Sequence, residues 1–437
     1  MTGGHWETQN KVRPGAYINF ETNDLAGAGV DSAGPVAIPL ALDWGKPKAF
    51  TEVSPNTNFI ELFGKSLSEL IPVREAFKGT SQVLIYNLSG EGTKATTTSG
   101  TFEATALYGG IEGNKITVTV SVGLDDGATV KTFYGSTQMD AQTVESAAEL
   151  EANAFVTFSG ELPEEDATLS LSGGSTTGAT NDSYASFAEG LDSQSFKVVA
   201  VGTDDDSIKT LFSAKVIHWR EDEGKNVTFV TNNYNAADHE GVVSVKNSVV
   251  LDGYEVIEAE NAVYWYAAAY ATADTNSLTY TEYPGAIDCE RLSHEEIVKA
   301  LKDGHIVFTF QQGLDGIDRI VIEQDINTFR TFTVKKNQDF RKNKIIRSID
   351  ILSDNVQHIY SRTFIGKVNN DEDGRNLFKG QVMTAVLDGL VSRGAIEPYD
   401  PDEFIVEQGN EKDAVLARLS IKFNDAMEKL YMTVECK

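Results

Sequence analysis

The feature that most constrains this chain is the alternation of apolar residues in its final stretch. Leu430, Met432, Val434 and Cys436 are each separated by one residue. A period of two is typical of a β-strand with one buried face. Because a chain end frays unless a sheet holds it, this stretch needs other strands to pair with. If those strands belong to a second copy, strand addition would link the copies into a polymer.

A second apolar alternation lies near the N-terminus, in residues 14–21, where one face would carry apolar side chains at every other position. We therefore predict two arms, residues 1–22 and 427–437, that pair with neighbouring copies. The side chains expected to make these inter-subunit contacts are Ala16, Tyr17, Ile18, Phe20, Leu430, Met432 and Val434.

Composition excludes several classes of function. The formal net charge is −28, whereas a nucleic-acid partner needs a basic face. The longest uncharged run of helical character, residues 261–273, is too short to cross a bilayer and is predicted to be a buried helix. The first residues lack the basic and apolar regions of a signal peptide. We expect synthesis in the cytoplasm, and we favour two buried free thiols, Cys289 and Cys436, over one disulfide between them.

The pattern of residues changes three times and predicts a multidomain α/β and α+β fold. Residues 23–91 mix short strands with an amphipathic helix. Residues 92–181 are rich in Thr, Ser and Gly with closely spaced strands, which indicates a small β-sandwich insert interrupted by a helix at 141–150. Residues 182–331 alternate strands and helices, which predicts a parallel sheet covered by helices. Residues 332–426 carry two long helical patterns and then strands.

Motifs that would carry chemistry are incomplete. Gly64–Ser66 ends like a phosphate-binding loop, but Phe59 stands where its first glycine is required. His294 begins a zinc-protease pattern whose second ligand position is Val298. The loop 369–374 lacks the Glu that would close a calcium site. The chain has no Gly-x-Ser-x-Gly elbow, and its six His residues form no motif. We therefore predict no catalytic, cofactor-binding or metal-binding residues.

One cluster of basic residues stands out in this acidic chain. It has two interpretations, a solvated helix face or a docking stripe that steers an acidic partner. If it is a docking stripe, reversing the charge of Lys342, Lys344 and Arg347 should block assembly and leave the subunit folded. The six members are Lys335, Lys336, Arg341, Lys342, Lys344 and Arg347.

Several segments in order along the chain resemble contractile phage tail sheath proteins of the Gram-positive type. The resemblance covers nearly the whole chain and is most specific in its last hundred residues. The segments that carry it are Arg13–Tyr17, Glu61–Gly64, Tyr108–Asn114, Gly366–Asn370, Gly374–Arg375, Gly394–Glu397, Asp413–Val415 and Asp425–Met432.

This resemblance implies a structural protein and no enzyme. It implies a subunit that polymerises helically as stacked rings around a tail tube and contracts to drive the tube through a cell envelope. Residues 182–331 would be the family's subtilisin-like domain, which lacks protease chemistry, and 332–426 its C-terminal domain. The partners would be further copies, the tail tube protein, and baseplate and tail terminator proteins. No cofactor, nucleic acid or membrane insertion is implied, and the six basic residues become candidates for docking on the tube.

The resemblance also implies a location in the tail of a phage or phage-tail-like particle, assembled in the bacterial cytoplasm. Two other functions stay open from the residues alone. One is a serine-hydrolase-like α/β enzyme, and the other is an adhesin or binding module suggested by the Thr/Ser/Gly-rich insert. Neither alternative explains arms at both ends of the chain.

Overall fold

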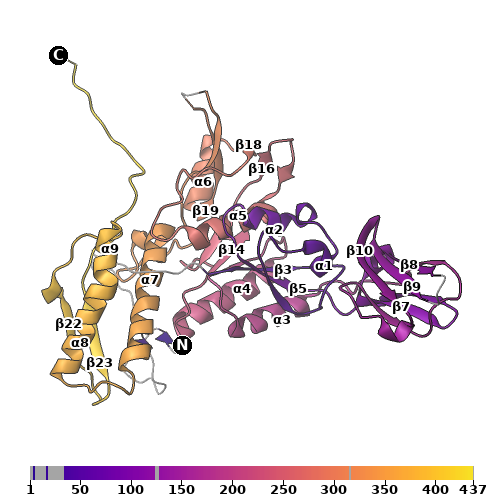
Figure 1. Cartoon of the computed structure of the whole chain (residues 1–437). Coiled ribbons are helices and arrows are strands. Elements are labelled where there is room, and N and C mark those ends of the chain that lie inside the picture. Colours follow the sequence, from indigo (N-terminus) through magenta and orange to yellow (C-terminus); the bar gives the residue numbers. More distant parts are fainter. Residues whose placement is uncertain (1–2, 5–15, 18–33, 124–126, 314–315, 437) are drawn as a thin grey trace. The chain divides into compact units, whose positions relative to one another are not determined.

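The computed structural model describes residues 3–4, 16–17, 34–123, 127–313 and 316–436. The chain forms two compact units (Figure 1). The first unit comprises residues up to Ala37, then Glu75–Thr80, and Ser195 onward. The second comprises Ile38–Arg74 and Ser81–Gln194. These two units are coarser than the six segments expected from the sequence. The individual domain boundaries therefore stay a prediction.

A parallel sheet lies at the centre of the first unit. Its strand order is β19 (His305–Ile306), β15 (Val242–Val245), β14 (Thr228–Asn232), β13 (Val198–Ala200), and then the first residues of β3 (Val36–Leu40). Every pairing among these strands is parallel. The strands are nearly continuous apolar runs because a parallel sheet is buried on both faces. The predicted parallel sheet is confirmed.

Helices cover this sheet. The helix α5 (Ala259–Thr272) packs on β13, β14 and β15, and α4 (Asp206–His218) packs on β14. The interior of α5 is apolar on all sides, and ten consecutive residues, Ala262–Ala271, are buried. The prediction of a buried helix at 261–273 is therefore correct. Among the described residues, no helix is both long and apolar enough to cross a membrane.

Smaller elements complete the central part of the first unit. A three-stranded antiparallel sheet consists of β16 (Val249–Leu251), β17 (Val256–Ile257) and β18 (Ala286–Cys289). The helix α6 (His294–Lys302) begins at a capping box made by Ser293 and Glu296. A hairpin, β20 (Phe308–Gln311) and β21 (Arg319–Ile322), follows.

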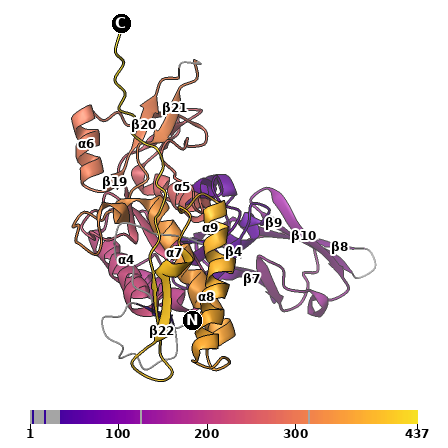
Figure 2. The same cartoon turned by 90° about the vertical axis from the view of Figure 1, so that its left-hand side faces the viewer.

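The last hundred residues of the first unit are α+β. The long helix α7 (Asn343–Ile359) continues as a wider turn through Phe364. The helix α8 (Glu372–Val382) runs through a similar turn into α9 (Asp388–Ser392), and the left-handed Gly394 ends it. An antiparallel pair, β22 (Phe404–Gln408) and β23 (Val415–Leu419), lies beside α8 (Figure 2).

A shared core holds these helices and strands together. Aromatic and aliphatic side chains from α7, α8, β22 and the segment after β23 meet in one cluster. Its buried members are Leu352, Phe364, Phe378, Val382, Val386, Leu387, Phe404 and Ile421.

The second unit contains β4 (Phe50–Val53), β5 (Val83–Asn87), α1 (Phe59–Phe63), most of α2 (Ile71–Ala76) and α3 (Asn181–Gly190). It also contains the predicted β-sandwich. One sheet has the order β10 (Thr137–Val144), β9 (Ala128–Tyr134), β8 (Ile116–Val122), β12 (Ala167–Ser170). The other has the order β11 (Val156–Ser159), β7 (Phe102–Gly109), β6 (Lys94–Ser99).

The helix predicted at 141–150 is wrong. Residues 141–144 belong to β10 and pair with β9, and only a short turn at Ala147–Glu149 is helical. The strand is more stable than the helix because its pairing with β9 places Val144 opposite Ala128 and buries both side chains. An isolated ten-residue helix is only marginally stable.

Candidate subunit interface

Backbone pairing holds the segment after β23 against the rest of the first unit as far as Asn424. Phe423 pairs with Ile396 in an isolated antiparallel bridge. The backbone N–H of Asn424 donates to the carbonyl of Ala395 at 2.9 Å. Beyond this point the chain is extended and belongs to no strand within the described residues. In Figure 1 it runs as an extended trace from the end of α9 to the C-terminus.

Apolar side chains of this extended segment face solvent. Leu430 is 84% exposed, Met432 73% and Val434 70%, and Tyr431 on the opposite side is 90% exposed. Large apolar side chains gathered in one exposed segment mark an interaction surface. The structure thus places Leu430, Met432 and Val434 on the predicted arm in an extended conformation. Cys436, expected to be buried, is exposed, whereas Cys289 is buried as expected.

The N-terminal arm is described only in part. Ala16–Tyr17 form β2, which pairs in parallel with β1 (Gly3–Gly4). Ile18 and Phe20 lie outside the described residues. The role of the four N-terminal residues in contacts between copies stays a prediction.

The pair β22 and β23 offers places where a further strand can be added. It is a two-stranded sheet, so within the described part of the chain each strand keeps one unpaired edge. An isolated pair of strands is marginal, and an added strand would strengthen it. Ile405 on β22 is 44% exposed, so the sheet also presents an apolar side chain on its open face.

The six basic residues do not form one free stripe. Lys335 is exposed, and Lys344 is half-buried on α7. Lys336 binds the carboxylates of Glu221 and Glu240, and Arg341 donates to the carbonyl of Leu301. Lys342 binds Glu428 of the arm.

Arg347, the sixth basic residue, is an interior residue. It is 2% exposed, and its guanidinium binds Asp325 at 2.8 Å. The predicted docking role therefore does not fit Arg347. The proposed charge reversal at Arg347 would not leave the subunit folded, because it would place two carboxylates together in the core.

Two buried ion pairs fasten α7 to the elements around the parallel sheet. In the first, Asp325 binds Arg347 and also accepts hydrogen bonds from Tyr266 at 2.7 Å and Asn343 at 3.1 Å. Burial opposes ionisation of Asp325, but Arg347 and these hydrogen bonds hold its pKa below the ordinary value. In the second, Arg220 binds both oxygens of Asp350, at 2.9 and 2.6 Å. Both ion pairs are buried and join α7 to segments that are distant in the sequence.

A group of potential metal ligands is already neutralised by a side chain. Glu221, His239 and Glu240 each place a ligand atom within 4.8 Å of the others. The Lys336 ammonium lies against both carboxylates, at 3.3 Å from Glu221. Burial opposes ionisation of Glu240, but His239, Lys336 and Arg220 together hold its pKa at about 2. Lys336 is therefore the cation of this cluster.

A Ser–His pair exists in the parallel sheet but has no access to substrate. The His305 Nδ1 lies 2.9 Å from the Ser244 Oγ, and Ser244 is fully buried. Burial lowers the pKa of His305 to about 4, with Lys246 acting in the same direction. The pair is a packing feature of two neighbouring strands.

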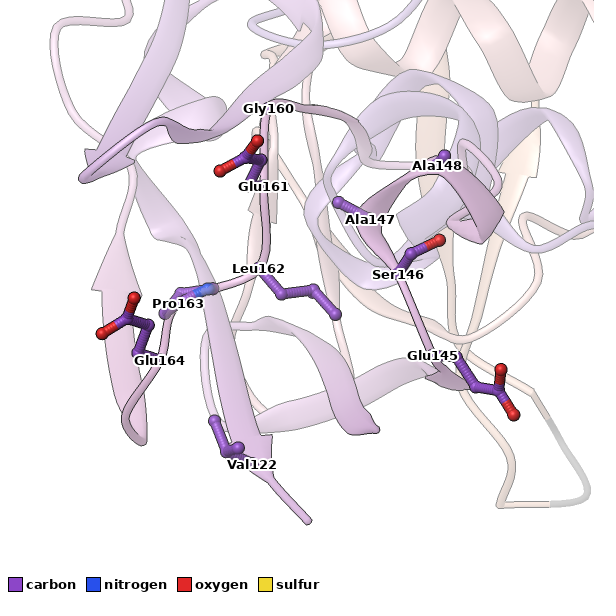
Figure 3. A pocket seen from close by; sticks show the side chains of 10 residues that line it. All are labelled: Val122, Glu145, Ser146, Ala147, Ala148, Gly160, Glu161, Leu162, Pro163 and Glu164. Carbon is purple, nitrogen blue, oxygen red and sulfur yellow. The ribbon is translucent and has the colours of Figure 1, made fainter. Parts of the chain in front are cut away.

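A hollow on the sandwich has a volume of about 480 Å³ (Figure 3). Its wall carries Glu145, Glu161 and Glu164 around Val122 and Leu162. The side chains shown there include no His, Cys or Lys, so the groups in this hollow that could act as a base or nucleophile are three carboxylates and the Ser146 hydroxyl.

Comparison with known proteins decides what these features belong to. Four family descriptions match the chain in succession: tail sheath protein Gp18 domain III N-terminal region (33–88), phage tail sheath protein beta-sandwich domain (90–179), phage tail sheath protein central domain (177–328) and phage tail sheath C-terminal domain (335–437). The protein is also 35% identical to the phage-like element PBSX protein XkdK of Bacillus subtilis, over 100% of both chains. The chain belongs to the phage tail sheath family.

Solved sheath proteins share its fold. The sheath tail protein of Desulfitobacterium hafniense is 34% identical with a TM-score of 0.83, covering 97% of this chain and 100% of its own. The sheath tail protein of Listeria innocua is 32% identical with a TM-score of 0.78, covering 93% and 96%. This sheath protein is a structural component of a phage or phage-like tail and is not an enzyme. Membership of the family implies assembly into a polymeric sheath with other tail components.

Proposed function

We propose that this sheath protein polymerises helically, as stacked rings around a tail tube, and that its arms link the copies. The observation that carries this proposal is the extended segment 429–436, whose apolar side chains are exposed in the single chain. Residues 429–436 would add as a strand to the β22–β23 pair of a neighbouring copy. The N-terminal arm would make a second link of the same kind.

Such a link would draw its energy from two sources, apolar burial and added strand hydrogen bonds. Burying Leu430, Met432 and Val434 contributes about 1.5–3 kcal/mol each before the cost of ordering the arm. Each added strand hydrogen bond contributes about 0.5–1.5 kcal/mol. A link of this kind would persist while the two bodies that it joins rotate.

Contraction would follow from a second packing of the same rigid subunits. The two buried ion pairs on α7 support this proposal, because they keep the last hundred residues and the parallel sheet together as one body. The subunits would move between two arrangements while the arms stay paired, and contraction would drive the tube through the cell envelope. The tail tube protein and the baseplate and terminator proteins are the partners that this role requires. For docking on the tube, Lys335 is the exposed candidate of the six basic residues.

The arm is tested by substitution within it. We expect Leu430→Asp with Val434→Asp to abolish polymers and to leave folded monomers, because two carboxylates would have to be buried in each link. The measurement is electron microscopy together with the circular dichroism of the soluble fraction. The matched control is Glu435→Gln in the same arm, which should polymerise normally. Polymers of normal yield from the double variant would refute the role of the arm.

A further inference from the structure

The root of the C-terminal arm is held by a contact that the sequence did not reveal. After Asn424, Met427 is fully exposed, but the next residue, Glu428, again contacts the first unit. The Glu428 side chain is only 10% exposed, although Leu430 two residues later is 84% exposed. A single buried carboxylate in an otherwise exposed segment needs specific partners.

Those partners are Lys342, the residue immediately before α7, and Thr279, in the loop between α5 and β18. One oxygen of Glu428 binds the Lys342 ammonium, and the other accepts a hydrogen bond from the Thr279 hydroxyl at 2.9 Å. Asp425 adds a second carboxylate 3.6 Å from Lys342. Thr279 in turn accepts a hydrogen bond from the backbone N–H of Asp325, so this contact ends on the buried network of α7.

The start of α7 has a matching need for negative charge. A helix N-terminus carries a partial positive charge, and the first turn of α7 contains no acidic residue. Lys342 and Lys344 add two more positive charges at the same end. Burial lowers the pKa of Lys344, and the Asp425 carboxylate acts in the opposite direction. The acidic root of the arm supplies the charge that this end of the helix lacks.

We propose that Lys342, Thr279 and Glu428 form a clasp that fixes where the arm leaves the subunit. With the clasp closed, the free arm consists of residues 429–436, which span about 26 Å when extended at about 3.3 Å per residue. With the clasp open, the free arm begins at Asp425 and gains four residues, or about 13 Å. The clasp is thus the point at which a link between copies lengthens under load. This last step rests on the proposed role of the arm, whereas the clasp itself does not.

The clasp is tested on the monomer by electron spin resonance. The full chain carries spin labels at Lys429→Cys and at Asn376→Cys on α8, in a Cys436→Ser background. We expect a narrow distribution of distances between the labels, because the clasp holds the arm immediately before residue 429. Glu428→Gln and, from the other side, Lys342→Gln should each broaden this distribution at least twofold. The matched control is Glu435→Gln at the exposed end of the arm, which should leave it narrow.

The outcomes distinguish a failure of the clasp from a failure of the proposed role of the arm in polymerisation. A distribution that stays narrow in both Glu428→Gln and Lys342→Gln overturns the clasp. Glu428→Gln should still polymerise, since Leu430, Met432 and Val434 are unchanged. If the Leu430→Asp, Val434→Asp variant polymerises but keeps its narrow distribution, the proposed role of the arm fails and the clasp stands.

Discussion

At the scale of the residue, the chain's charges show what sequence reasoning can and cannot supply. The basic cluster was visible in the sequence, but its partners were not. Asp325, Asp350 and Glu428 lie far along the chain from Arg347, Arg220 and Lys342, and only the fold brings them together. The docking interpretation required an acidic partner on another protein. For Lys342 and Arg347, the acidic partners are carboxylates of the same chain.

Arg347 is expected to be essential for stability. Arg347→Met leaves Asp325 buried without its counterion, and removing one partner of a buried pair costs about 3–5 kcal/mol. Chemical denaturation of the monomer, followed by tryptophan fluorescence, measures the loss. The control Lys335→Ala changes an exposed member of the same cluster and should shift the free energy of unfolding by less than about 0.5 kcal/mol. An Arg347→Met protein as stable as the wild type would show that the pair is not structural.

His305 is expected to make the fold acid-sensitive. Its pKa is about 4 in the folded chain, against an ordinary value of about 6.5, so the unfolded chain binds the proton first as pH falls. Stability from this group is complete above about pH 6.5 and is lost as pH falls toward 4. We expect His305→Gln to flatten the pH dependence of the unfolding midpoint between pH 6.5 and 4. An unchanged slope would mean that His305 titrates normally.

At the scale of the element, local patterns predicted the parallel sheet and the buried helix α5 correctly. The apolar runs of the sheet and of α5 depend on local sequence alone. The failure at 141–150 has a different origin, because β10 is a strand only through its pairing with β9. The arm was predicted from its alternation, but its clasp depends on side chains just before α7 and in the segment before β18.

Two glycines should respond in opposite directions to the same change. A Cβ on Gly202 would lie 1.8 Å from the carbonyl oxygen of Glu260, so Gly202→Ala must displace the start of α5 and should cost about 2–3 kcal/mol. A Cβ on Gly380 would meet nothing within 4 Å, and Gly380→Ala should stabilise α8 by about 0.5–1 kcal/mol. Thermal unfolding of the two monomers measures both changes. Equal effects would contradict the packing described for α5.

At the scale of the whole molecule, the fold class, the sheath family and the absence of complete catalytic motifs could all be predicted from the sequence. The grouping of segments into two units could not, because Glu75–Thr80 joins the first unit although its neighbours in sequence belong to the second. The pairing of basic residues with carboxylates of the same chain could not be predicted either. The grouping of segments and this pairing depend on contacts between residues that are distant in the sequence, which local patterns do not report.

The central claim concerns what residues 429–436 contact in the assembled particle. An electron cryomicroscopy map of the sheath, at a resolution that separates strands, measures this directly. We expect these residues to form a third strand beside β22 and β23 of another copy, with Leu430, Met432 and Val434 covered. A map in which they fold back on their own subunit, or stay uncovered, would refute the proposal that this arm links the copies.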